Sequence, residues 1–157
     1  MLPFRSQPPA PRLREGYALL WQPPVEAPEL NRLLAVCGER PRDPSRWQQV
    51  LARSSWHLGV RNDRSELVGF LRATSDQALN ANLWDLLSDP ADPGRPEVIA
   101  ALVHSGLGRL RRELGGCSIS LSAPPEALTA LTRMGFVVDP GGIRAMGLQL
   151  EGPGTPP

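Results

Sequence analysis

The sequence predicts one domain of the α/β (α+β) class, with a mixed, mostly antiparallel central sheet and helices on both faces. Three observations support this prediction. The chain has 157 residues and an apolar fraction of 41%, which is enough for one buried core. Three strand-like runs follow one another with short loops between them, as in antiparallel sheets. A long helical segment then leads into another strand, and such a crossover adds a parallel strand.

The first third of the chain predicts a strand and two helices. YALLWQ (17–22) is a short apolar run closed by two prolines, which is typical of a strand. Apolar residues recur at helical spacing over 29–37, and Gly38 ends this helix. Ser45 is predicted to be the N-cap of a second helix, RWQQVLARSS, with Gln48 completing a capping box.

Three strands are predicted in the middle of the chain. They are WHLGVR (56–61), ELVGFLRATS (66–75) and ANLWDLLS (81–88). NDRS lies between the first two and carries the polar residues of a hairpin turn. We therefore expect these strands to pair as antiparallel neighbours.

The last third predicts a long helix and four shorter elements. Pro96 suits the first turn of the helix, and Glu97 suits its positive end. The apolar face continues to Leu114, and the two following glycines end the helix. The shorter elements are a strand CSISLSA (117–123), a helix PPEALTALTRMG (124–135), and two strands FVV (136–138) and IRAMGLQL (143–150).

We expect a single domain over residues 17–150. Residues 1–16 are rich in proline and arginine and predict a disordered lead-in, and residues 151–157 predict a flexible tail. The formal net charge is +1, so no global field attracts nucleic acid or an acidic membrane surface. No apolar run approaches the length of about 18 residues that a membrane span needs. The two cysteines have no metal-ligand spacing, so no metal site is predicted.

Several stretches, taken in order, resemble the GNAT family of acyl-CoA-dependent N-acetyltransferases. They are LVGFLRATSD (67–76), LNANLWDLLSDP (79–90), ISLSAPPEALTALTRMGF (119–136) and DPGGIRAM (139–146). They are most similar to the plastid and cyanobacterial branch, which includes serotonin-acetyltransferase-like enzymes. The resemblance covers roughly residues 17–150. It implies the GNAT fold and the transfer of an acetyl group from acetyl-CoA to a primary amine.

In this family a loop written Q/R-x-x-G-x-G/A opens the central helix, and its backbone N–H groups hold the CoA pyrophosphate. The physical basis is general, because a helix N-terminus offers free donors and a partial positive charge. The corresponding residues here read R-x-x-V-x-A, with Val98 in place of the first glycine. Pro96 removes a donor, Val98 adds a branched side chain near the phosphate path, and Glu97 adds a negative charge beside a polyanion. We therefore expect a degraded cofactor loop.

The resemblance implies a cofactor site formed by this loop and the end of the preceding strand. The implied residues are Leu86, Leu87, Ser88, Gly94, Arg95, Val98, Ile99 and Ala100. In this family the strand before the loop splays from its neighbour, and its free backbone groups pair with the pantetheine. The backbone of Leu86 to Ser88 would also polarise the thioester carbonyl.

The resemblance also implies a tyrosine that protonates the leaving thiolate, and Leu131 occupies that position. The only tyrosine is Tyr17, far away in the sequence. Asp85 is the candidate to orient or deprotonate the amine, and a salt bridge is its alternative role. Asp76 and Asn80 are candidate acceptor-binding residues, and turn formation is their alternative role.

Two functions remain open from the sequence. One is an acetyltransferase with a degraded cofactor loop, and the other is a catalytically silent GNAT-fold protein that binds or regulates a partner. The acceptor is open between a small arylalkylamine, a polyamine, a protein N-terminus and a lysine side chain. A homodimer or a protein partner is compatible with the family. The resemblance implies a cyanobacterial cytoplasm or a plastid stroma.

Overall fold

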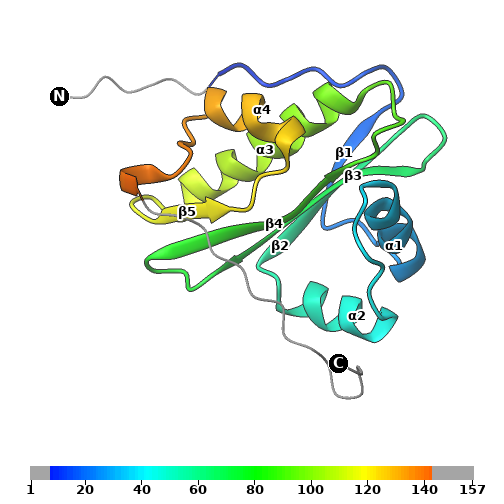
Figure 1. The fold of residues 1–157 in the computed structure, drawn as a ribbon, viewed down its shortest axis with the longest axis horizontal. Helices are drawn as coiled ribbons and strands as arrows, with labels where there is room; N and C mark the ends of the chain where they lie inside the picture. The colour runs from blue at the N-terminus through cyan, green and yellow to red at the C-terminus, as the bar shows by residue number, and fades with distance from the viewer. Residues whose placement is uncertain (1–7, 143–157) are drawn as a thin grey trace.

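The computed structural model of the protein describes residues 8–142 and shows a five-stranded sheet with helices on both faces (Figure 1). The strands are β1 (Ala18–Trp21), β2 (Trp56–Arg61), β3 (Leu67–Ser75), β4 (Asn80–Ser88) and β5 (Ser118–Leu121). The helices are α1 (Ala27–Val36), α2 (Pro44–Arg53), α3 (Arg95–Glu113) and α4 (Leu128–Arg133), with 3-10 turns η1 (Pro125–Ala127) and η2 (Pro140–Gly142). The predicted fold class is confirmed.

The strands lie in the order β1-β2-β3-β4-β5. The first four pair antiparallel with their neighbours in sequence, and β5 pairs parallel with β4. The parallel pair is joined through α3, because parallel neighbours need a crossover connection. The sheet is therefore mixed and mostly antiparallel, as the sequence predicts.

Two hydrophobic clusters fix the helices to opposite faces of the sheet. On one face, Leu102 of α3 and Leu131 of α4 belong to the same buried cluster as Leu71 of β3. On the other face, Leu33 of α1 packs in a second cluster with Phe70 of β3. Figure 1 shows this arrangement, with α3 and α4 on one side of the strands and α1 and α2 on the other. None of the described helices is long and apolar enough to cross a membrane.

The starts of α1 and α2 differ from the predicted ones. The capping box lies at α1, between Glu26 and Glu29. In α2 the N-cap is Asp43, whose carboxylate accepts a hydrogen bond from the N–H of Ser45 at 2.7 Å, so the prediction of Ser45 as the N-cap is wrong. Pro44 explains the shift, because its fixed φ favours the first helical position and its missing N–H costs nothing there.

The segment after α4 also differs from its prediction. FVV (136–138) forms no strand, and Val137 and Val138 are each 70% exposed. The reason is local: Gly135 adopts a positive φ of 98°, and the Phe136 N–H donates back to Leu131 O at 3.1 Å. These contacts end the helix in a turn, and the apolar run pairs with no strand of residues 8–142. The strand predicted over 143–150 lies outside the described residues.

Candidate active site

The parallel pairing between β4 and β5 ends halfway along β4. The last paired residues are Leu83 and Leu121, whereas β4 continues to Ser88. Asp89 donates its N–H to Val68 O of β3 at 2.9 Å. Along an antiparallel strand, the backbone N–H and C=O groups of successive residues point to alternate sides. Since Asp89 bonds to β3, the backbone groups of Leu86 and Ser88 point away from β3. We call this side of residues 84–88 the free edge of β4.

A bulge marks the start of the free edge. Between the pairs Phe70–Leu87 and Arg72–Trp84, β4 contains one residue more than β3. Asp85 lies in this bulge with a φ of 51°, in the left-handed region that only a few non-glycine residues adopt. Bulges re-aim backbone and side-chain groups, so the regular ladder is interrupted where the free edge begins.

The side chain of Asp85 is held by two arginines. Its Oδ1 accepts from Arg42 Nη2 at 2.8 Å, and its Oδ2 accepts from Arg72 Nε at 2.5 Å. Only 6% of the Asp85 side chain is exposed. Both oxygens of this carboxylate are occupied by charge-assisted hydrogen bonds. The geometry therefore favours a role for Asp85 in positioning β3, β4 and the α1–α2 loop.

The predicted residues at the end of β4 are almost fully buried. Leu86 packs in the α3-side cluster and Leu87 in the α1-side cluster, so the two side chains lie on opposite faces. Ser88 is 2% exposed, and its Oγ has no hydrogen-bond partner among the described residues. The Ser88 carbonyl accepts a weak hydrogen bond from Cys37 Sγ at 3.4 Å. The buried hydroxyl of Ser88 is thus an unsatisfied polar group at the free edge, a feature that native structures rarely keep without a reason.

Most donors at the start of α3 are already engaged. Asp92 Oδ1 accepts from the Gly94 N–H at 2.8 Å, and the Asp92 carbonyl accepts from the Arg95 N–H at 3.1 Å. Pro96 has no N–H, and the Val98 N–H bonds to Gly94 O within the helix. A phosphate at this helix end would have to displace the Asp92 carboxylate. Asp92 therefore engages two of the N–H groups at this helix end, and the degraded loop stays a prediction.

Arg95 and Glu97 each make one ion pair. Arg95 Nη2 lies 2.5 Å from Glu126 Oε1 in η1, and Arg14 Nε lies 3.8 Å from Glu97 Oε1. The Arg95–Glu126 pair joins the helix that follows β4 to the turn that follows β5. It therefore crosses between the ends of the two strands that enclose the free edge. Arg95 Nε and Glu97 Oε2 are buried and have no partner among the described residues.

The Val98 side chain is a core residue. It is fully buried, and a Cβ added at Gly69 of β3 would lie only 2.4 Å from Val98 Cγ1. Val98 thus fills the space that Gly69 leaves in the sheet, and its side chain points away from the helix end. The physical reason expected from the sequence, a branched side chain in the phosphate path, is therefore wrong for Val98.

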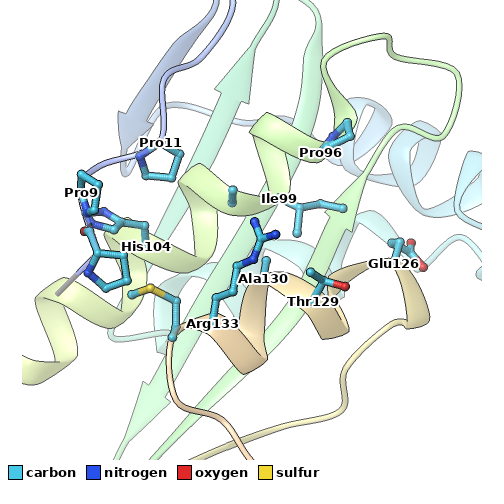
Figure 2. A pocket seen from close by; sticks show the side chains of 12 residues that line it. Pro9, Pro11, Pro96, Ile99, His104, Glu126, Thr129, Ala130 and Arg133 are labelled. Carbon is cyan, nitrogen blue, oxygen red and sulfur yellow. Dashed lines mark hydrogen bonds between the residues drawn. The ribbon is translucent and has the colours of Figure 1, made fainter. Parts of the chain in front are cut away.

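A groove of about 330 Å³ lies between α3 and α4 (Figure 2). Ile99 and Ala100 of α3 line one side, and Ala130 and Arg133 of α4 line the other. Figure 2 shows the Arg133 side chain reaching from α4 towards α3. The groove begins beside Pro96, so it continues from the helix end at which the family holds a pyrophosphate. Four of the predicted cofactor-binding residues therefore lie near one another. Gly94 and Arg95 lie at the start of α3, and Ile99 and Ala100 line the groove.

The segment before β1 covers this region. Residues 8–16 were expected to form a disordered lead-in, yet Pro8, Pro9 and Pro11 line the groove, and Pro8 O lies 3.0 Å from His104 Nε2. The Tyr17 hydroxyl donates to both Asp92 oxygens, at 3.0 and 3.1 Å. Burial and the hydrogen bond to Asp92 raise the pKa of Tyr17 above its usual value. Tyr17 is thus fixed at the start of α3, away from the bulge.

Leu131 and the β3–β4 turn complete the predicted set. Leu131 is 2% exposed and packs in the core beneath α4. Asp76 accepts from the backbone N–H groups of residues 78, 79 and 80, and these bonds hold its pKa well below the usual range. Asn80 begins β4, and five residues at about 3.3 Å each separate it from Asp85, roughly 17 Å. Asp76 and Asn80 therefore organise a turn that is remote from the free edge.

The sequence did not indicate a role for Asp92, for Tyr17 at the start of α3, or for the side-chain hydroxyl of Ser88. The motif Asp-Pro-Gly at 92–94 was a usable signal for Asp92, because an aspartate two residues before the N-cap can accept a hydrogen bond from the N-cap N–H. No local signal pointed to Tyr17, because its contact with Asp92 joins residues 75 positions apart.

Comparisons with known proteins agree with this geometry. No protein-family model matches the chain. The chain is 36% identical over 121 residues to an uncharacterized N-acetyltransferase, ycf52, of Porphyra purpurea, covering 75% of this chain and 68% of the relative. It is also 36% identical over 88 residues to GCN5-related N-acetyltransferase 2, chloroplastic, of Arabidopsis thaliana. That match covers 56% of this chain but only 33% of the plant protein.

Solved structures show the same fold. A probable acetyltransferase of unknown function from methicillin-resistant Staphylococcus aureus superposes with a TM-score of 0.74 at 14% identity, covering 85% of this chain and 99% of that one. A GNAT family N-acetyltransferase from Escherichia coli in complex with CoA gives a TM-score of 0.61 at 20% identity, covering 92% and 78%. At these identities the likeness concerns the fold alone.

Proposed function

The chain belongs to the GNAT family of GCN5-related N-acetyltransferases, and from this premise we propose that it transfers an acetyl group from acetyl-CoA to a primary amine. The observation that carries the proposal is the free edge of β4. Leu86 and Ser88 direct backbone groups to a side on which β5 has already ended, and the Ser88 hydroxyl, which has no partner within residues 8–142, lies at the same place. An extended chain with amide groups, such as pantetheine, can form hydrogen bonds with such an edge in the way that an added β-strand does.

The proposed reaction needs only the positioning of two substrates. The amine nitrogen attacks the thioester carbonyl, a C–N bond forms, and the C–S bond breaks. The departing CoA thiolate takes up a proton, and the amine gives its excess proton to water. Backbone groups at the bulge would stabilise the negative charge on the carbonyl oxygen. Leu131 offers no proton to the thiolate, so we assign most of the rate enhancement to proximity.

The Arg95–Glu126 ion pair has to open in this proposal. Leu86 and Ser88 are nearly fully buried although their outer side has no strand partner. Because the ion pair joins the segments that follow β4 and β5, we propose that it closes the route to the free edge. Once released from Glu126, the Arg95 guanidinium is available to bind a phosphate oxygen.

A second candidate is a GNAT-fold binding or regulatory protein without transferase activity. The specific observation in its favour is the engagement of the Gly94 and Arg95 N–H groups by Asp92. If these contacts persist in solution, the pyrophosphate loses its main donors, and each 1.4 kcal/mol lost corresponds to about a tenfold weaker affinity.

A backbone variant tests the proposal directly. We expect wild-type protein to release CoA thiol from acetyl-CoA in the presence of a panel of primary amines. Leu86→Pro removes the N–H that faces the free edge but no ladder hydrogen bond to β3, and it should abolish thiol release. Leu86→Ala makes a similar cavity, keeps the N–H, and should retain activity. Equal activity of the two variants would contradict the role of the free edge.

We propose the plastid stroma or a cyanobacterial cytoplasm as the location. Support comes from the relatives, whose names include chloroplastic enzymes and whose sources include red algae.

A further inference from the structure

The acceptor amine must reach the bulge from the face opposite α3. The start of α3 and the α3–α4 groove lie on one face of β4, which is where the family binds the cofactor. The opposite face carries α1, α2 and the loop between them. Arg42 of this loop and Arg72 of β3 both bind Asp85 in the bulge, so this face adjoins the proposed reacting position.

This face is hollowed along α2 and lined by arginine. One hollow of about 980 Å³ is lined by Arg40, Arg42 and Arg46, and a second of about 430 Å³ by Arg46, Arg53 and Arg72. Arg46 belongs to both, so the two hollows adjoin. We call them together the arginine groove.

The acidic residues of the arginine groove are already engaged. Asp85 is bound by Arg42 and Arg72. Asp43 accepts hydrogen bonds from the N–H and the hydroxyl of Ser45, and Glu39 lies 3.7 Å from Arg42.

The three exposed arginines, Arg40, Arg46 and Arg53, make no ion pair within residues 8–142. Among residues 8–142 the groove thus carries an excess of positive charge beside the proposed site of acetyl transfer, because five arginines face three carboxylates, those of Glu39, Asp43 and Asp85.

The charge of the groove decides which amines it accepts. A positive environment disfavours the ammonium form of an incoming amine, which lowers its pKa and raises the fraction of reactive free amine. The same environment repels acceptors that carry further positive charges and attracts those that carry negative ones. The groove therefore disfavours polyamines and basic peptides as acceptors, and it favours acceptors that contain carboxylate groups.

The spacing along α2 fits a peptide. Arg46 and Arg53 are seven residues apart, so they lie on one helix face about 10 Å apart at a rise of 1.5 Å per residue. Side chains on the same face of an extended chain are two residues apart, or about 7 Å, and the long arginine side chains can close the remaining difference. Arginine binds carboxylates with two parallel hydrogen bonds, so two acidic side chains on one face of an extended peptide can each meet a guanidinium.

We propose that the acceptor is the N-terminal amine of an acidic peptide, whose first residues lie in the arginine groove. This inference rests on the proposed acetyl transfer. The α-amine would be placed at the bulge, and the carboxylates of the following residues would pair with Arg46 and Arg53.

The experiment compares three peptides of equal length with a free N-terminus and no lysine. One carries aspartate and glutamate at positions 2–5, one serine and glutamine, and one arginine. We expect kcat/KM for the acidic peptide to exceed the neutral one by about tenfold, and the arginine peptide to be poorer still. Arg46→Glu and Arg53→Glu should each lower kcat/KM for the acidic peptide by about fivefold to tenfold. Arg112→Glu, on the exposed end of α3, is the matched control and should leave it unchanged.

The outcomes separate this inference from the proposed function. Equal use of the three peptides, or an unchanged preference in Arg46→Glu and Arg53→Glu, would overturn it while acetyl transfer stands. Faster acetylation of free glutamate than of the acidic peptide would overturn the peptide assignment. Binding of an N-terminally labelled acidic peptide, followed by anisotropy without acetyl-CoA, is expected to weaken in Arg46→Glu. An unchanged affinity there would contradict the inference even if acetyl-CoA does not bind.

Discussion

Replacing Asp92 by asparagine should strengthen the binding of acetyl-CoA. The Asp92 carboxylate accepts from the Gly94 N–H and from the Tyr17 hydroxyl, at the helix end where the family holds a pyrophosphate. Asparagine keeps the size and one acceptor oxygen but removes the negative charge. The free protein should lose about 1 kcal/mol of stability, because a carboxylate near a helix N-terminus is replaced by a neutral amide.

The expected gain follows from simple electrostatics. A phosphate oxygen bound to the Gly94 N–H would lie about 5 Å from the Asp92 carboxylate. Two unit charges at that distance repel by about 3 kcal/mol at an effective dielectric constant of 20. A change of the Asp92 side-chain rotamer in the complex would reduce this repulsion in the wild-type protein. We therefore expect a net gain of about 1.4 kcal/mol, which is about a tenfold lower Kd.

Isothermal titration calorimetry of acetyl-CoA into wild type and Asp92→Asn measures this difference. Glu113→Gln is a suitable control, because it removes a carboxylate from the far end of α3, where Glu113 pairs with Arg109. It should leave Kd unchanged. An unchanged or weaker affinity in Asp92→Asn would refute the idea that this carboxylate competes with the pyrophosphate.

Three further outcomes are expected. Glu126→Gln should release Arg95 and lower the Kd for acetyl-CoA about threefold to tenfold by calorimetry, and an unchanged Kd would show that the ion pair does not close the site. Gly69→Ala should lower the free energy of unfolding in urea by about 1 to 3 kcal/mol through its clash with Val98, and adding Val98→Ala should recover part of that loss; purely additive effects would contradict the packing. Asp76→Ala should lower Tm at pH 7. Because folding lowers the pKa of Asp76, its contribution is present above about pH 4 and is lost as pH falls below that, so the Tm difference should shrink in acid; a constant difference would contradict it.

The sequence was most informative where local and tertiary preferences agree. β2, β3 and β4 are long apolar runs with turn residues between them, and α3 has a continuous apolar face over 19 residues. It was less informative where two local signals compete. At α2, the capping preference of Ser45 lost to Asp43 and Pro44 together. At FVV (136–138), β-branched residues predict a strand, but a strand also needs a partner to pair with.

The candidate site was harder to predict because its key contacts join distant segments. The free edge depends on where β5 ends, and no pattern within β4 reveals that. Tyr17 meets Asp92 only after β1 has been placed beside β2, and Asp85 meets Arg42 and Arg72 only through the α1–α2 loop and β3. From the sequence, Asp85 was therefore open between a base and a salt-bridge partner, and its contacts with Arg42 and Arg72 favour the second role.

The central claim is that the chain still binds and uses acetyl-CoA through the free edge of β4. The most direct measurement is calorimetric titration of acetyl-CoA into the wild-type protein. We expect saturable binding with a Kd in the micromolar range, which corresponds to a binding free energy of about −8 kcal/mol. If no binding is detected at millimolar acetyl-CoA in either wild type or Asp92→Asn, the acetyltransferase proposal is contradicted and the silent binding protein becomes the better account.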